Sequence, residues 1–319
     1  MKKLLLTLFL TVMVSAVAQA QQISVVSSNG ATTLYSTLQE AIEGASNGSV
    51  IYLPGGGFPI SDEVKITKKL TIIGIGHYTK NENVDGVTTI LGNLFFNEES
   101  GGSAVMACYI TGNVNIGVDD ILIRYCNLNS VQVNNQTCKG TEINQNYIRS
   151  SSNFNQTPAK ITNNVMWSVG YVTGGNISYN FFNGWFNAYY GGATYEINSS
   201  FVSNNCFNQG DLTNYSNTIT SGNMGTSDHV GDNCIYLGEN VNWNDVYVNY
   251  NNGAISPKSD FHFKDDYKQY ENKVGIYAGD TPFNDNQIAP VPHIVAKHVD
   301  EHTDTTGKLN IKIRVKAGQ

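Results

Sequence analysis

A repeated asparagine pattern constrains the fold of this chain more than any other feature of its sequence. The segments KITNNVMW (160–167), NISYNFF (176–182) and FVSNNCF (201–207) each carry a β-branched apolar residue, an asparagine three positions later and a bulky residue two positions after that. Short period-2 bursts broken by Asn, Gly and Ser exclude a helical repeat and predict short β-strands. The apolar lead residue recurs at intervals of 20, 18, 16, 25 and 17 residues, at Ile123, Ile143, Ile161, Ile177, Val202 and Ile219.

This spacing predicts an all-β solenoid. Each strand is too short to bury a face alone, so the chain must coil until each turn stacks on the one before it, as in a parallel β-helix. Equivalent strands of neighbouring coils then lie about 4.8 Å apart.

The asparagines are predicted to form a ladder at one corner of the coil. A corner residue must tolerate the left-handed region, which Asn does readily and Gly222 would do in the last unit. Amides at the same corner of successive coils can also hydrogen-bond along the stack. The predicted ladder residues follow the lead by three or four positions and are Asn127, Asn146, Asn164, Asn180, Asn205 and Asn223.

These repeats resemble those of the right-handed parallel β-helix superfamily typified by pectate lyases, and two flanking segments strengthen the resemblance. TTLYSTLQEAIEGASNGSVIYLPGGGFPISDEVKITKKLTIIGIG resembles the opening module of secreted bacterial β-helix proteins, and SDFHFKDDYKQYENKVGIYAGDTPF resembles the closing module of those from Bacteroidetes-type bacteria. The resemblance covers most of residues 31–283. It implies a right-handed, single-stranded parallel β-helix over residues 21–280, and a polysaccharide as substrate or ligand.

The N-terminus predicts export. Residues 1–20 combine two lysines, an apolar run and the small-residue sequence Ala18-Gln19-Ala20, which is typical of a signal peptide. We therefore expect a periplasmic, cell-surface or extracellular protein without membrane insertion, because no later stretch is long and apolar enough to cross a bilayer. The formal charge of −7 becomes −9 once Lys2 and Lys3 are removed, which argues against nucleic acid as a partner.

Further modules are expected at the two ends. Residues 31–46 contain the capping box Thr37-Leu-Gln-Glu40 and predict a short helix that covers the open end of the solenoid. Residues 293–319 alternate apolar and polar side chains and predict a small β-hairpin. The Pro-containing residues 281–292 between the solenoid and the hairpin are interpreted as a linker.

The repeat contains few groups able to cleave a glycosidic bond. A lyase needs a positioned base and a positive charge, and a hydrolase needs paired carboxylates. No cofactor is predicted, and the acidic cluster of a Ca²⁺-dependent lyase is missing. The five cysteines have no metal-ligand spacing, although a bridge between Cys126 and Cys138 stays open. The ionisable residues from 140 to 225, leaving tyrosines and cysteines aside, are Glu142, Arg149, Lys160, Glu196 and Asp211.

Two groups of candidate site residues remain. The loop GTSDHVGDN brings Asp228, His229 and Asp232 together in sequence, where they could bind a cation or act as acid and base, although an Asp/Gly turn explains them equally. Aromatic residues beside asparagine amides suit a neutral or weakly charged sugar. The outward aromatic candidates are Trp167, Tyr171, Trp185 and Tyr189, with Trp243 as a weaker one.

Three functions are compatible with these observations. The scarcity of ionisable groups favours a non-catalytic exported protein that binds glycan or a surface partner. The first alternative is a polysaccharide lyase or glycoside hydrolase of the pectate-lyase-like superfamily. The second alternative is a structural surface module without a small ligand, because a fold alone does not decide function.

Overall fold

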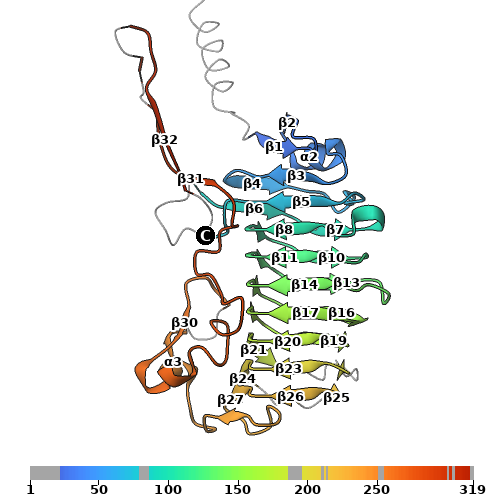
Figure 1. Cartoon of the computed structure of the whole chain (residues 1–319), viewed down its shortest axis with the longest axis vertical. Coiled ribbons are helices and arrows are strands. Elements are labelled where there is room, and N and C mark those ends of the chain that lie inside the picture. The colour runs from blue at the N-terminus through green and yellow to red at the C-terminus, as the bar shows by residue number, and fades with distance from the viewer. Residues whose placement is uncertain are drawn as a thin grey trace, which may run out of the picture.

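The computed structural model describes residues 22–78, 86–185, 196–209, 212, 215–250, 255–299, 302–303 and 306–316. The predicted signal peptide, residues 1–20, lies outside them. Figure 1 shows a tall column of stacked coils, with the hairpin of β31 (His293–Val299) and β32 (Ile311–Lys316) projecting beside its N-terminal end. The chain is all-β and forms a right-handed parallel β-helix.

Three sheets run along the column, and each coil visits them in the order A, B, C. Sheet A has 11 strands, in the order β2 (Thr32–Tyr35), β1 (Ile23–Val26), β3 (Ser49–Tyr52), β5 (Leu70–Ile73), β8 (Ala104–Met106), β11 (Leu122–Arg124), β14 (Thr141–Asn144), β17 (Ala159–Thr162), β20 (Asn176–Ser178), β23 (Phe201–Ser203) and β26 (Ile219–Ser221).

Sheet B has 10 strands, in the order β28 (Ile235–Tyr236), β27 (Met224–Gly225), β24 (Cys206–Gln209), β21 (Phe181–Trp185), β18 (Val165–Met166), β15 (Tyr147–Ile148), β12 (Asn127–Leu128), β9 (Tyr109–Ile110), β6 (Thr88–Leu91) and β4 (Gly56–Pro59). Sheet C has 7 strands, in the order β25 (Tyr215–Ser216), β22 (Ile197–Asn198), β19 (Val169–Thr173), β16 (Ser152–Thr157), β13 (Val131–Val133), β10 (Val114–Ile116) and β7 (Leu94–Phe96).

The core is a stack of side chains that repeats from coil to coil. On sheet A, Ile123, Ile143, Ile161, Ile177 and Val202 pair in register and are fully buried, as the repeat predicted. The prediction for the last unit was wrong by one residue. Thr220, not Ile219, continues this row, and Ile219 points outward. On sheet B, the rings of Phe182 and Phe207 stack in the same way, 5.3 Å apart.

The N-terminal end is closed by α2 (Leu38–Gly44) and the antiparallel strand pair β1–β2. Both hydrogen bonds of the predicted capping box are present, from the Glu40 N–H to Thr37 Oγ1 and from the Thr37 N–H to Glu40 Oε2, each 3.2 Å long. Leu38 and Ile42 of the helix are buried against the first coils. The helix therefore protects the apolar end of the column from water.

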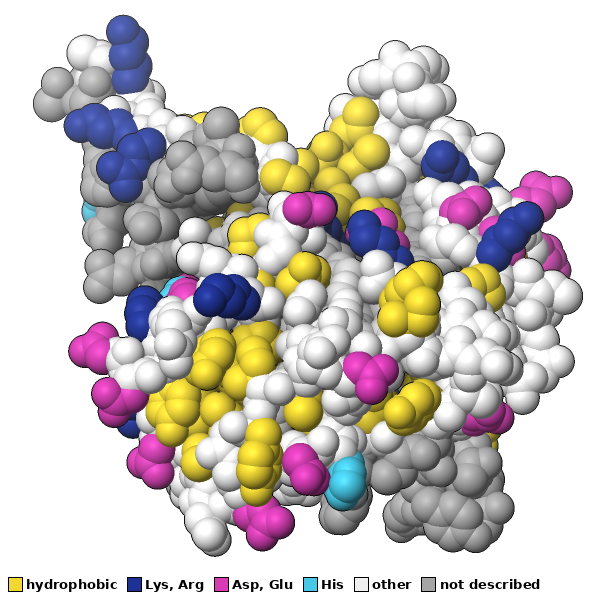
Figure 2. Space-filling view, turned by 60° about the horizontal axis from the view of Figure 1, so that its bottom comes forward, with side chains coloured by type: hydrophobic (Ala, Val, Ile, Leu, Met, Phe, Trp, Pro, Cys, Tyr) yellow, Lys and Arg dark blue, Asp and Glu magenta, His cyan; other side chains and the backbone are white. Residues whose placement is uncertain are grey.

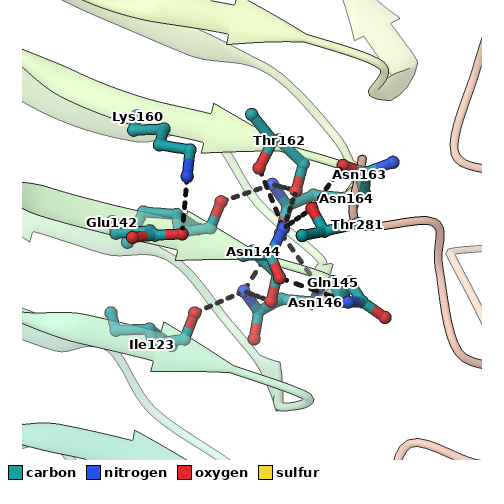
Figure 3. Close-up of polar contacts among 11 residues, drawn as sticks. Ile123, Glu142, Asn144, Gln145, Asn146, Lys160, Thr162, Asn163, Asn164 and Thr281 are labelled. Carbon is teal, nitrogen blue, oxygen red and sulfur yellow. Dashed lines mark hydrogen bonds and ion pairs between the residues drawn. The ribbon is translucent and has the colours of Figure 1, made fainter. Parts of the chain in front are cut away.

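The predicted ladder runs through five of the six asparagines. The Asn146 Nδ2 donates to Oδ1 of Asn164, 3.0 Å away, and the next rungs are 2.9, 3.0 and 3.1 Å long (Figure 3 shows the first rung). Each Oδ1 also accepts the backbone N–H of the ladder residue one coil earlier, and each Nδ2 also donates to backbone carbonyls. The ladder residues are Asn146, Asn164, Asn180, Asn205 and Asn223.

Asn127 is not a rung, because Cys126 occupies the ladder position in its coil. The Cys126 N–H donates to Asn146 Oδ1 at 2.9 Å, and the Cys126 thiol donates to the carbonyls of Arg124 and Val105. Ladder asparagines donate from Nδ2 to the equivalent two carbonyls, so the cysteine replaces the amide donor. The described cysteines, Cys138 among them, are all free thiols, so the bridge left open in the sequence is not formed.

The left-handed corner residue lies one position before each ladder asparagine. The prediction that the ladder asparagines themselves adopt the left-handed backbone was therefore wrong. Positive φ angles occur at Gln145, Asn163, Tyr179, Asn204 and Gly222, between 56° and 64°. The ladder asparagines themselves have negative φ. Their side chains are therefore selected by buried hydrogen bonds and not by tolerance of a left-handed backbone.

The C-terminal module covers the outer face of sheet B. It consists of α3 (Trp243–Val246), β29 (Tyr247–Asn249), β30 (Asp260–Phe263) and η3 (Asp265–Tyr270). Its aromatic side chains pack against Phe181, whose ring lies 4.8 Å from that of Phe261 and 5.5 Å from that of Trp243. The module therefore covers sheet B around Phe181, and a pocket of about 290 Å³ remains beside it, where Asn208 of β24 faces Trp243 and Tyr250.

Residues 275–291 form a strap that lies along the column, so residues 281–292, interpreted from the sequence as a linker to the hairpin, also pack against the solenoid. The strap contacts the column at Asn163 and Gln145 of two neighbouring coils and, nearer the N-terminal end, at His77, and it ends against sheet A, where Ala289 packs near Ile73. In Figure 1 this orange-to-red segment runs from the C-terminal coils back toward the N-terminal end. The hairpin β31–β32, which follows the strap, therefore lies at the N-terminal end of the column.

Candidate functional site

The outer face of sheet C carries a row of side-chain amides. Asn115, Gln132 and Asn153 occupy one outward register on β10, β13 and β16. In the following coils Thr173 pairs with Asn198. Because strand alternation turns these side chains away from the core, Asn115, Gln132 and Asn153 repeat a hydrogen-bonding group about every 4.8 Å. Gly170, the partner of Asn153 on β19, interrupts this row before Thr173 and Asn198.

A groove of about 420 Å³ opens at the C-terminal half of this face. It forms where β16 bulges, since Asn155 and Gln156 adopt left-handed backbone angles of 51° and 63° and the register with β19 shifts there. Its volume lies in the range of small-ligand sites, about 300–1,000 Å³. The described lining residues are Gln156, Tyr171, Thr173, Glu196 and Asn198.

The lining chemistry suits hydroxyl groups. Two amides, a threonine hydroxyl and a phenol can each donate and accept hydrogen bonds. Glu196 is the one carboxylate among the described lining residues, and it accepts a hydrogen bond from the Ser216 hydroxyl. A single carboxylate provides neither the acid and base pair of a hydrolase nor the ligands of a Ca²⁺ ion.

Of the four predicted aromatic residues, the structure places Tyr171 in the groove. Trp167 is 39% exposed but lies in the turn after β18 and packs on Gly184 of sheet B. The Trp185 side chain and the whole of Tyr189 lie outside the described residues. Trp243 is buried and stacks on Tyr247 at 5.2 Å, so its outward placement was wrong.

The candidate catalytic loop forms the C-terminal cap of the column. Val230 is fully buried in the main core, and its carbonyl accepts the last ladder hydrogen bond, from Asn223 at 3.0 Å. Asp228 and His229 form an exposed pair 3.3 Å apart, and Asp232 is also exposed. Since the three side chains point into solvent from a capping loop, the geometry provides no enclosed site for them.

A second ionisable cluster lies in the C-terminal module. His262 Nδ1 is 2.8 Å from Asp260 Oδ1, and its Nε2 is 3.6 Å from Glu271 Oε1. The imidazole stacks on Tyr277 at 3.8 Å, and burial together with Asp285 raises the pKa of the Tyr277 phenol. Both ring nitrogens therefore face carboxylates of the same module, and these contacts hold the His262 ring of β30 against Tyr277 at the start of the strap.

Sequence reasoning missed Gln156, Thr173, Glu196 and Asn198. The alternation in Glu196-Ile-Asn198 places both polar residues on one face of β22 and could have indicated them. No comparable pattern in the sequence indicates the bulge that opens the groove.

Within the residues that the structure describes, no three or more His, Cys, Asp or Glu side chains gather into a set able to hold a metal ion. No helix of the described chain is long and apolar enough to cross a membrane. No family model, curated protein or solved structure matches this chain.

Proposed function

We propose that this protein is an exported, non-catalytic β-helix that binds a neutral or weakly charged polysaccharide along the outer face of sheet C. The observation that carries the proposal is the groove beside Tyr171, which is lined by amides and hydroxyls and a single carboxylate. Sugars are recognised by stacking on aromatic rings and by amide hydrogen bonds, and this groove offers both.

The repeat of the fold supports a polymer as the ligand. Outward polar side chains on Asn115, Gln132 and Asn153 form a row on the same sheet, which ends at Gly170 on the N-terminal side of the register shift that opens the groove. A chain laid along this face would meet an amide at each of these three coils, about 4.8 Å apart, and then the groove. A small molecule would not use this extended row.

The resemblance to pectate-lyase-like proteins of Bacteroidetes-type bacteria is part of the proposal, since it supports export and a polysaccharide ligand. The lyase or hydrolase alternative is less favoured, because Glu196 has no second carboxylate beside it among the described lining residues. The remaining alternative is a structural module that binds no glycan.

The test is a glycan array probed with the wild-type chain and with Tyr171→Ala, Glu196→Gln and Trp167→Ala. We expect Tyr171→Ala to abolish retention. Glu196→Gln, which keeps a hydrogen-bonding group, should weaken retention only about two- to threefold if the glycan is neutral. Trp167→Ala lies outside the groove and is the matched aromatic control. Its retention should equal that of the wild type.

A reducing-end and unsaturated-uronide assay over the same polysaccharides completes the test. If the array retains no glycan, the remaining function is that of a structural module. Release of new reducing or unsaturated ends would replace the binding proposal with the enzyme.

A further inference from the structure

We infer that copies of this chain associate head to tail, with the β31–β32 hairpin of one copy lying on the last coils of the next. The inference depends on two exposed apolar surfaces at opposite ends of the column and on their opposite charges. It is independent of the proposed glycan groove on sheet C.

The first surface is the apolar face of the hairpin. β31 and β32 pair only with each other in the described chain, and a two-stranded ribbon is marginally stable in water unless another surface covers it. Ile311, Ile313 and Val315 alternate along β32 and are each more than half exposed. Seven residues of β31 make the hairpin about 24 Å long.

The second surface lies on the outer face of sheet A at the C-terminal end. Phe201 of β23 and Ile219 of β26 are register partners and are 55% and 60% exposed. Outward positions one and two coils earlier carry Asn176 and Lys160, so apolar residues replace polar ones at the end of the column.

The charges of the two surfaces are complementary. The segment 306–316 contains Lys308, Lys312, Arg314 and Lys316 and no acidic residue. At the last coils the structure places two acidic residues: Asp232, whose N–H donates to Thr220 Oγ1 next to Ile219, and Glu196, which accepts from the Ser216 hydroxyl. Figure 2, in which the C-terminal end comes forward, shows hydrophobic side chains interspersed with Asp and Glu there, and Lys and Arg on the projecting segment. Opposite charges of this kind steer association and select the partner surface.

The occupant is a second copy because the two surfaces occur on one chain at opposite ends (Figure 1). An interface between different patches is heterologous, and it continues from copy to copy unless a rotation closes it into a ring. One hairpin face is smaller than a standard interface, so the association is weak, with a Kd of about 10–100 µM.

The test is sedimentation velocity of the full chain at about 1 to 500 µM, a range set by the expected weak interface. Wild type should grow from monomer to dimer and larger species, and added salt should weaken the growth. Ile311→Glu with Ile313→Glu, and separately Phe201→Asp with Ile219→Asp, should each weaken it at least about tenfold. All four positions are exposed, and thermal unfolding followed by circular dichroism checks that the folds are intact.

An equimolar mixture of the two double variants makes the test specific. Each variant keeps the surface that the other lacks, so the mixture should form dimers that grow no further. Asn134→Asp with Gln136→Glu adds the same two negative charges in the exposed loop after β13, away from both surfaces, and should associate as wild type does.

Three results would overturn the inference. The wild type could stay monomeric over the whole range. Phe201→Asp with Ile219→Asp could leave association unchanged, which would mean that hairpins pair with each other. Finally, a monomeric wild type that binds phosphatidylglycerol vesicles would assign the hairpin to a lipid surface.

Discussion

The side-chain amide of Asn163 donates a hydrogen bond to the carbonyl of Ala278, 2.7 Å away, across 115 residues of sequence. The same nitrogen donates to the Ile276 carbonyl at 2.8 Å. Asn163 occupies the left-handed corner just before the ladder residue Asn164, so one asparagine turns the coil and the next joins it to its neighbours (Figure 3). The corner that turns this coil is therefore also the point where the strap is bonded to the solenoid.

Asn163→Gly should release the strap. Glycine keeps the left-handed corner without strain, so the change removes only the amide and leaves two buried carbonyls without their donor. We expect a loss of about 2–4 kcal/mol in the free energy of unfolding, and faster hydrogen exchange in residues 275–291 than in the coils. Asn217→Gly, an exposed left-handed corner residue, is the matched control. Equal exchange in the two variants would show that Asn163 does not hold the strap.

Asn164→Ala should destabilise the whole column. The change removes the hydrogen bond to Asn180 and leaves the N–H of Asn146 and the carbonyl of Ile143 unsatisfied in the core. Each buried unsatisfied group costs about 1–3 kcal/mol, so a loss of about 3 kcal/mol or more is expected in urea unfolding.

Asn164→Cys should cost less than Asn164→Ala, because Cys126 already makes the equivalent bonds at this position with its thiol. If the alanine variant were as stable as wild type, the ladder would not contribute to stability.

Acidification should destabilise the contact between His77 and Gln287, near the end of the strap that leads to the hairpin. Its Nε2 lies 3.1 Å from Gln287 Oε1, and burial lowers the pKa of His77 from 6.5 to about 4. Between these values the unfolded chain binds more protons than the folded chain, so stability is complete above pH 6.5 and is lost as the pH falls toward 4. The loss is about 3 kcal/mol. Urea unfolding of wild type and His77→Gln at pH 7.5, 6 and 4.5 measures it, and parallel pH profiles would contradict it.

The five cysteines should differ in how fast their thiols react in the folded protein. Burial raises the pKa of Cys126 and of Cys206 to about 12, raises that of Cys108 well above its usual value, and also raises the pKa of Cys138. Only the thiolate reacts readily, so at pH 8 the partly exposed Cys234 should react with a disulfide reagent and the other four should react on unfolding. Cys234→Ser should remove the fast reaction. Fast reaction of a second thiol in the folded protein would show that the core opens.

The sequence predicted the solenoid because its periodicity records contacts between neighbouring coils. Ile143 and Ile161 stack because each coil repeats the last, so an interval of 18 residues in sequence becomes one strand spacing in space. The prediction of Asn127 as a rung and of Ile219 as a core residue failed at the ends of the repeat. There the pattern slips by one residue, which exchanges the inward and outward faces.

What the sequence alone determined is the stacked architecture and its asparagine ladder, because both depend on contacts that recur at a nearly fixed interval. The tertiary structure decided the groove beside Tyr171, the capping role of the Asp228 loop and the course of the strap. Each of these depends on contacts made once. The left-handed pair at Asn155 and Gln156 and the hydrogen bond from Asn163 to Ala278 do not recur from coil to coil among the described residues, so no periodicity in the sequence indicates them.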